Sequence, residues 1–300
     1  MQIGIDVGAT KIESVVLEED GNEKHRSRTE CPKDYLSIIS TIKDIHHNLE
    51  KEFQIDLPIG VCHPGIHSPQ TGLVKNAPNC YWLEKKPFQS DLRKALGKEV
   101  FCENDGNCFA LSEAIDGAGK HYKIVYGIIL GSGAGGGLVI DKQIVSGPNG
   151  VAGEWGHNQI PYFAAKKENF NSNNAREAEV ESFISGLGMA KRFNKIYGKN
   201  LKTNEIFELN RRHDLDAERF IDDFKLNLAM SLSTIINILD PDAFIFGGGV
   251  SNEIDFLSEI ENMVKKFVIG KEYDGVFLKP KYGDASGVRG AARLGRRTTY

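Results

Sequence analysis

The chain has 300 residues, of which 40% are hydrophobic, and a formal net charge of −4. A chain of this length can form two domains with separate cores, because single domains usually contain about 100–200 residues. The slightly negative net charge argues against a nucleic-acid-binding surface, so no nucleic-acid partner is expected. The stretch 293–297 is locally basic and is interpreted as a solvated C-terminus. No apolar stretch approaches the ~20 residues of a membrane span, so no membrane partner is expected.

The cysteines and the start of the chain indicate the compartment. Five cysteines occur, at positions 31, 62, 80, 102 and 108, an odd number without the spacing of a disulfide framework. Reduced thiols of this kind are typical of a reducing compartment. The first strand begins at residue 2, and no signal peptide precedes it. The sequence therefore predicts a cytoplasmic protein.

The first predicted element is an apolar strand that ends at Asp6 and is followed within one turn by Gly8, Thr10 and Lys11. A carboxylate at the tip of a buried strand can hold a metal–phosphate complex. A glycine beside it lets backbone N–H groups approach an anion without a Cβ in the way. The alternative is an ordinary hairpin turn, because the β-branched residues 12–17 indicate a second strand.

The next elements complete an α/β unit. Residues 35–53 form a predicted amphipathic helix, because apolar side chains such as Ile38, Ile42 and Leu49 recur on one face. Short apolar runs at 57–62 and 99–102 are predicted strands, and the first ~105 residues therefore form one unit of strands and helix.

Asp105 lies between a predicted strand and a predicted helix, within Glu103-Asn104-Asp105-Gly106-Asn107. Such junctions present side chains outward, and a carboxylate there can take a proton from a substrate hydroxyl, which is worth roughly 10²–10⁴ in rate. The alternative is structural, because Asn-Asp-Gly sequences often cap a helix or turn the chain.

The segment 131–137, Gly-Ser-Gly-Ala-Gly-Gly-Gly, follows the apolar run 128–130. It satisfies the glycine spacing of a dinucleotide-binding loop, but that motif requires a helix next. Residues 138–145 instead form a predicted strand, so we expect a hairpin whose amides face an anion. Gly65 closes the run 57–61 in a similar way, and Gly247–Gly249 follow the apolar run 243–246.

A second polar group occurs at 153–158, where Glu154 and His157 lie among glycines. Carboxylates, amides and imidazoles suit hydroxyl-rich ligands, because each sugar hydroxyl both donates and accepts hydrogen bonds. A lone histidine in this position is otherwise a structural residue. Residues 163–178 are polar without a clear period and are predicted to form a loop, whereas 217–239 is a predicted helix that ends at Asp240-Pro241.

Six segments in this order resemble the ROK family of bacterial sugar kinases and repressors, and the match covers nearly the whole chain. They are Asp6–Lys11, Pro64-Gly65, Asn104-Asp105, Gly131–Gly137, Gly153–His157 and Gly247–Gly249. Chance rarely produces five or more such motifs in register, whereas any one of them alone is a weak signal.

The resemblance implies an α/β fold of two actin-like ATPase (ribonuclease H-like) domains with an active-site cleft between them. We expect residues 1–115 to form the N-terminal domain, joined by a C-terminal helix at 286–300, and residues 116–285 to form a larger C-terminal domain. The family often forms dimers, so a homodimer is one assembly that the sequence leaves open.

The resemblance also implies a role for each motif. Asp105 is the general base on the primary hydroxyl of the sugar, and Asp6 lies near Mg²⁺, as an indirect ligand, and near the phosphates of ATP. The expected ATP-binding and phosphate-binding residues are Asp6, Gly8, Thr10, Lys11, Gly131, Ser132, Gly133, Gly135, Gly247, Gly248 and Gly249. The expected sugar-binding residues are Gly65, Asn79, Asn104, Asp105, Glu154, His157 and Glu181.

One departure from the family is large. The family usually carries a Cys-x-Cys-Gly-x-x-Gly-Cys-x-Glu segment whose three thiolates join a histidine around a structural zinc. Here Ser172, Asn174 and Glu179 replace the cysteines, on the register set by Glu181. With His157 as the one surviving ligand, structural zinc is not expected. Either packing and hydrogen bonds now order the loop, or the sugar site is less firmly held.

The sequence thus predicts an ATP-dependent kinase of a hexose primary hydroxyl. Residues 153–158 and 237–242 look most like the fructokinase/mannokinase branch, but 107–113 is equally at home in N-acetylglucosamine kinases. The alternative of another class is a non-catalytic, sugar-responsive regulator. The family's repressors carry a DNA-binding domain before the phosphate motif, whereas that motif starts at residue 2 here, and this favours the enzyme.

Overall fold

A computed structural model describes residues 1–160 and 175–295. The first half of the chain builds a five-stranded sheet in the order β3-β2-β1-β4-β7. Its strands are β1 (Gln2–Val7), β2 (Lys11–Leu17), β3 (Glu23–Glu30), β4 (Ile59–His63) and β7 (Val100–Asn104). The first three strands pair antiparallel, while β4 and β7 run parallel to β1. The register aligns Asp6 with Cys62 and Glu103, so the ends of three strands meet at one edge.

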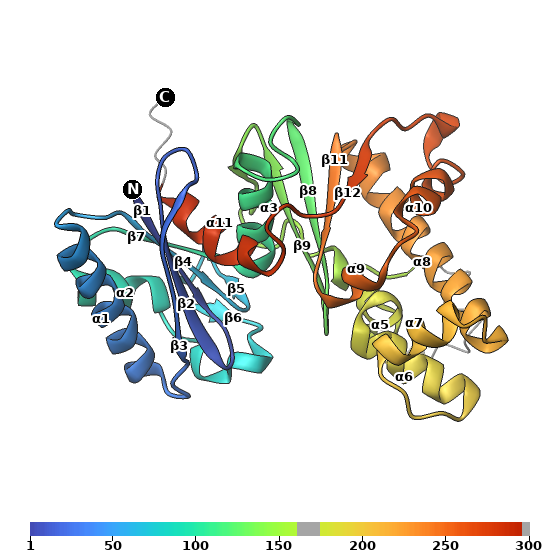
Figure 1. Cartoon of the computed structure of the whole chain (residues 1–300), viewed down its shortest axis with the longest axis horizontal. Helices are drawn as coiled ribbons and strands as arrows, with labels where there is room; N and C mark the ends of the chain where they lie inside the picture. The colour runs from blue at the N-terminus through green and yellow to red at the C-terminus, as the bar shows by residue number, and fades with distance from the viewer. Residues whose placement is uncertain (161–174, 296–300) are drawn as a thin grey trace.

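The second half repeats this plan in the order β10-β9-β8-β11-β12. Its strands are β8 (Ile124–Leu130), β9 (Ala134–Ile140), β10 (Gln143–Ile144), β11 (Ala243–Gly247) and β12 (Val276–Leu278). Again three strands are antiparallel neighbours, and two more run parallel to the first. Figure 1 shows the two sheets in separate halves of the molecule.

Helices cover each sheet and contribute to the core on which it packs. In the first half, α1 (Tyr35–Phe53) and α2 (Phe88–Leu96) contribute to one buried cluster with β1 and β4. The second half carries α5 (Glu181–Ile184), α6 (Gly186–Tyr197), α7 (Thr203–Arg211), α8 (Leu215–Leu239), α9 (Gly249–Glu253) and α10 (Leu257–Val264). The long helix α8 is the centre of the larger buried cluster. A small hairpin of β5 (Ile66–His67) and β6 (Val74–Lys75) follows β4.

Two further helices lie between the sheets. The helix α3 (Asp105–Ile115) packs on β8 and β9, and the last helix, α11 (Ser286–Leu294), packs on α3, β1 and β4 (Figure 1). This packing requires glycine, because a Cβ on Gly290 would lie 1.8 Å from the carbonyl oxygen of Cys108. Buried Glu113 of α3 accepts a hydrogen bond from Ser286 Oγ at 2.8 Å. The end of the chain is therefore fastened to the helix that begins at Asp105.

Most of the predicted elements occur as expected, with three corrections. Residues 138–145 are not one strand: β9 ends at Ile140, and Asp141 and Lys142 form a turn in the left-handed region, with φ of 51° and 65°. Of the predicted loop 163–178, residues 163–174 lie outside the described residues, and Ala175–Ala178 form a 3₁₀ turn. The C-terminal helix ends at Leu294, and 296–300 lie outside the described residues. The domain boundary at 115/116 stays a prediction.

Candidate active site

A cavity of about 1440 Å³ is lined by residues from both halves of the chain. All of the expected sugar-binding residues lie in it, together with part of the glycine hairpin. These lining residues are Gly65, Asn79, Asn104, Asp105, Glu154, His157, Glu181, Gly131, Ser132, Gly133 and Gly135. The predicted sugar and phosphate motifs are therefore brought together in one site.

Asp105 is placed in the cavity by the junction of β7 and α3. Asn104 is the N-cap of α3, because its side chain accepts a hydrogen bond from the Asn107 N–H at 2.8 Å. The Asp105 Oδ1 accepts a hydrogen bond from the Gly106 N–H at 2.9 Å. The Asp105 side chain is accessible from the cavity although protein surrounds it deeply, and burial raises the pKa of its carboxyl above the usual 3.8. The structural and the catalytic interpretations of this segment are therefore compatible, because Asn104 caps α3 and the Asp105 carboxylate stays accessible to a ligand in the cavity.

Glu154 faces this junction from the second half of the chain. Asn104 Nδ2 donates a hydrogen bond to Glu154 Oε1 at 3.0 Å. Burial raises the pKa of the Glu154 carboxyl above its usual 4.5, and the charge of His157 opposes that rise. A Glu154 oxygen is thus fixed by a neutral donor at the wall of the cavity.

Glu181 joins the sugar side of the cavity to the glycine hairpin. Its Oε2 accepts a hydrogen bond from the Ala134 N–H at 2.7 Å. The hairpin turn itself is closed by a bond from the Gly131 N–H to the Gly133 carbonyl at 2.9 Å. The predicted hairpin is confirmed, and the first residue of its second strand, Ala134, is held by a carboxylate from α5.

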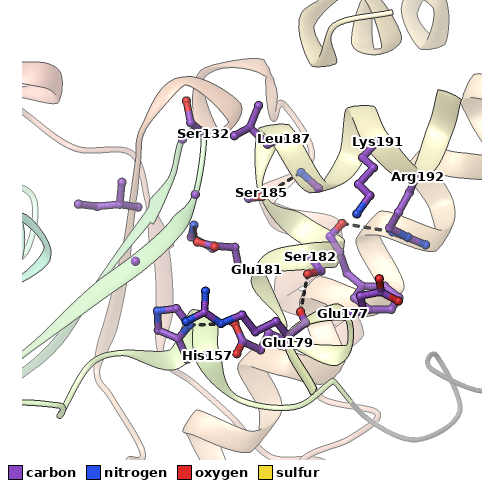
Figure 2. A pocket seen from close by; sticks show the side chains of 18 of the residues that line it. Ser132, His157, Glu177, Glu179, Glu181, Ser182, Ser185, Leu187, Lys191 and Arg192 are labelled. Carbon is purple, nitrogen blue, oxygen red and sulfur yellow. Dashed lines mark hydrogen bonds and ion pairs between the residues drawn. The ribbon is translucent and has the colours of Figure 1, made fainter. Parts of the chain in front are cut away.

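His157 and Glu179 form a pair at the rim of the cavity, and Figure 2 shows the two side chains turned toward each other. Their Nδ1 and Oε2 atoms are 2.9 Å apart. The family comparison identifies Glu179 as a residue that replaces a cysteine. The two residues are 22 positions apart, so no local sequence pattern predicts their contact.

Pro64 and Gly65 form the turn after β4. Gly65 has a φ of +80°, and a Cβ there would lie 2.7 Å from the carbonyl oxygen of Lys75. Cys62 and His63, which precede the turn, are fully buried and do not line the cavity. They therefore contact the fold behind the sugar site.

The first phosphate motif lies at the turn between β1 and β2, outside the cavity lining. The Gly8 N–H donates to the Lys11 carbonyl at 2.9 Å, so the hairpin turn considered as the alternative is present, and the phosphate-binding role stays a prediction. Lys11 Nζ lies 3.5 Å from Glu13 Oε2 and its side chain is half exposed. Burial raises the pKa of the Asp6 carboxyl from 3.8 to about 6; a hydrogen bond with Cys62 opposes this and the charge of Asp105 adds to it.

The segment Gly247–Gly249 also lies outside the lining, at the end of β11. Gly247 pairs with Ile129 of β8, and a Cβ on Gly248 would lie 2.5 Å from the carbonyl oxygen of Leu130. This segment is therefore packed against the start of the glycine hairpin, and its expected place beside a nucleoside stays a prediction.

The described residues can be compared with the ligands that zinc and magnesium require. For zinc, residues 1–160 and 175–295 contain no group of three or more His, Cys, Asp or Glu side chains that could hold a metal ion. His157 Nδ1 is already bonded to Glu179, so the described residues do not fit a thiolate zinc site. For Mg²⁺, the buried oxygens of Asp6 are suitable ligands, because this ion prefers carboxylate oxygen and keeps several waters.

The cavity also includes side chains that the sequence interpretation did not single out. Leu187 and Lys191 of α6 line it, and Leu187 is 70% exposed although it is apolar. Figure 2 shows both of them on the wall opposite His157. The glycines at 186 and 188 that flank Leu187 were the available signal.

Comparison with known proteins bears on the class. The model of the ROK family matches residues 2–298. N-acetyl-D-glucosamine kinases from Pasteurella multocida and Mannheimia succiniciproducens are 35% and 36% identical to this chain, and each comparison covers 98% of this chain and 99% of the relative. A ROK family glucokinase from Streptomyces griseus, solved with glucose and AMPPNP, is 26% identical with a TM-score of 0.74, covering 98% of both chains. A ROK hexokinase from Thermus thermophilus shares the fold, with 23% identity and a TM-score of 0.87 over 98% of this chain and 97% of that one.

Fold and site together define the class as ATP-dependent sugar kinases with the actin-like ATPase fold. The chain belongs to the ROK family, as the six motifs predicted. It lacks the cysteines that usually bind zinc in this family.

Proposed function

We propose that this chain transfers the γ-phosphate of ATP to the primary hydroxyl of N-acetylglucosamine. The observation that carries the proposal is the placement of Asp105 in one cavity with the sugar-binding candidates and the glycine hairpin. The relatives support the N-acetylated hexose, because those at about 35% identity over nearly their full length are named N-acetyl-D-glucosamine kinases. The fructokinase/mannokinase branch expected from the sequence finds no such support, so the alternative becomes the main interpretation.

Asp105 acts as the general base in this proposal. Phosphoryl transfer depends on alignment and charge stabilisation more than on covalent catalysis, so the carboxylate has to orient the hydroxyl and accept its proton. The raised pKa of the Asp105 carboxyl makes it a better proton acceptor than an ordinary aspartate. Its position at the first turn of α3, fixed by the Asn104 cap, holds the base rigidly.

The sugar is held by side chains of complementary hydrogen-bonding character. Glu154 has one oxygen bonded to Asn104, and within residues 1–160 and 175–295 its other oxygen has no hydrogen-bond partner and can accept from a sugar hydroxyl. His157 supplies a ring nitrogen at the rim, and Asn79 supplies an amide from the 3₁₀ turn Pro78–Leu83. These groups can fix the ring hydroxyls while the primary hydroxyl meets Asp105.

The phosphates are cradled by the hairpin at 131–135, where glycines leave the backbone of the turn approachable, although the Gly131 N–H itself is bonded within the turn. Asp6 is the residue that would hold Mg²⁺, through water, and the ion when bound neutralises phosphate charge. ATP as the phosphate donor favours the cytoplasmic location expected from the sequence.

The position of the new phosphate tests this proposal. The purified chain is incubated with ATP, Mg²⁺ and N-acetylglucosamine, and the product is examined by phosphorus and carbon NMR. Phosphate on the primary hydroxyl is expected, and the 6-deoxy analogue should bind without being phosphorylated. Phosphate on the anomeric oxygen would overturn the assignment of Asp105 as base for the primary hydroxyl.

A further inference from the structure

We propose that Glu179 is a positioning residue that orients the His157 ring for the sugar and thereby sets hexose affinity without taking part in phosphoryl transfer. This inference rests on the proposed function, because it assigns His157 to a sugar hydroxyl. It is carried by the contact between the two side chains, the backbone that holds them and the exposure of the ring.

The backbone around the pair is a short antiparallel bridge. Gln159 and Glu179 are bridge partners. The Ile160 N–H donates to the Ala178 carbonyl at 2.7 Å, and the Val180 N–H donates to the Asn158 carbonyl at 2.8 Å. Two segments that are distant in sequence are thus held together by backbone hydrogen bonds that use no metal ion, and the bridge at Gln159 brings the Glu179 side chain within reach of the His157 ring.

The exposed fractions of the two side chains differ. The Glu179 side chain is 16% exposed, whereas the His157 ring is 43% exposed at the cavity. The carboxylate is therefore partly withdrawn from water and its contact is less screened than that of a surface pair. The ring remains accessible to a ligand.

The contact also fixes which nitrogen meets the ligand. With Nδ1–H donating to the Glu179 carboxylate, the neutral tautomer of the ring would keep its lone pair on Nε2. Among the described residues Nε2 makes no hydrogen bond, so it can accept one from a hydroxyl. The backbone of His157 is anchored separately, because neighbouring Trp155 donates from Nε1 to the Gly135 carbonyl at 2.8 Å. Glu179 is thus the described side chain that sets the ring.

Steady-state kinetics with Glu179→Ala test the proposal. We expect the KM for N-acetylglucosamine to rise at least about tenfold, with kcat and the KM for ATP each changed by less than about twofold. Glu179→Gln should recover much of the affinity, because its amide oxygen still accepts from Nδ1–H. In a His157→Ala background, Glu179→Ala should add no further loss, because the ring it orients is absent.

Glu218→Ala is the matched control. His213 Nδ1 and Glu218 Oε1 form a similar pair at 2.8 Å, and neither residue lines the cavity. This variant should leave every kinetic constant unchanged, and melting temperatures check that all variants fold. The positioning role would be overturned if folded Glu179→Ala has an unchanged KM for N-acetylglucosamine. It would also be overturned if Glu179→Ala raises this KM further in the His157→Ala background. An inactive wild-type chain in the same assay would instead count against the proposed function.

Discussion

Asn104 and Glu154 are joined by a hydrogen bond of 3.0 Å, from the side-chain amide of the first to a carboxylate oxygen of the second. Asn104 ends β7 in the first sheet, and Glu154 belongs to the loop that follows β10 in the second. The same Asn104 side chain caps α3. One residue therefore couples the start of α3 to the sugar-binding candidates across the cavity.

Asn104→Asp should separate these two tasks. Aspartate caps a helix as well as asparagine does, so the melting temperature should stay close to that of the wild type. The new carboxylate would face that of Glu154 and remove the donor, so the KM for the hexose should rise at least about tenfold. Asn104→Ala should in addition lose about 1 kcal/mol of stability with the cap. An unchanged hexose KM in Asn104→Asp would remove this contact from the account.

Asp105→Asn should keep the fold and much of the sugar binding while kcat falls by at least about a hundredfold. The amide cannot accept the proton that the attacking hydroxyl releases. Calorimetric titration with N-acetylglucosamine measures binding, and ADP release measures turnover. Turnover equal to that of the wild type would exclude Asp105 as the base.

Asp6→Asn should stabilise the ligand-free protein at pH 7 and abolish most activity. The pKa of Asp6 is about 6 in the folded chain and ordinarily 3.8, so between these values the folded state binds more protons than the unfolded state. The free energy of unfolding therefore falls as pH rises through this window. Asparagine has no charged form, so the gain at pH 7 should be on the order of 1–3 kcal/mol.

Urea unfolding at pH 7 and at pH 4 measures this difference. At pH 4 the wild-type carboxyl is largely protonated in the folded state, and the advantage of asparagine should shrink toward zero. If the variant is less stable than the wild type at pH 7, the buried charge of Asp6 does not lower the free energy of unfolding, and this prediction is wrong.

The protein as purified should contain no stoichiometric zinc and should keep its melting temperature in a chelator. The expected ligand cysteines are replaced, and a histidine with a carboxylate is a weak substitute for four strong ligands. Elemental analysis that finds about one zinc per chain would point to His157 and Glu179 as ligands and would contradict the hydrogen-bonded pair.

Local patterns in the sequence predicted the elements that position Asp105. In α1, the apolar repeat placed Ile38, Ile42 and Leu49 on the buried face, and all three are buried. The capping signal at Asn104 and the strand before it put Asp105 at the right junction. These features depend on neighbours within a few residues, and local reasoning captures them.

Features that depend on distant residues escaped prediction. The turn at Asp141 and Lys142 has an aspartate but neither glycine nor asparagine, so the local signal for the end of β9 was weak. The His157 and Glu179 contact arises from a bridge between separate segments. A pocket for an N-acetyl group has no short motif, so the proposed choice between hexoses is supported by similarity to whole relatives.

The most direct test is kcat/KM for phosphorylation of five hexoses, measured by coupled ADP release with ATP and Mg²⁺. The five are N-acetylglucosamine, N-acetylmannosamine, glucose, mannose and fructose. We expect the highest value for N-acetylglucosamine, by at least about tenfold, since a site that pairs a polar group rejects analogues lacking it. A preference for fructose or mannose would contradict the proposed substrate. If no hexose is phosphorylated while some hexoses still raise the melting temperature, the kinase proposal would give way to that of a sugar sensor.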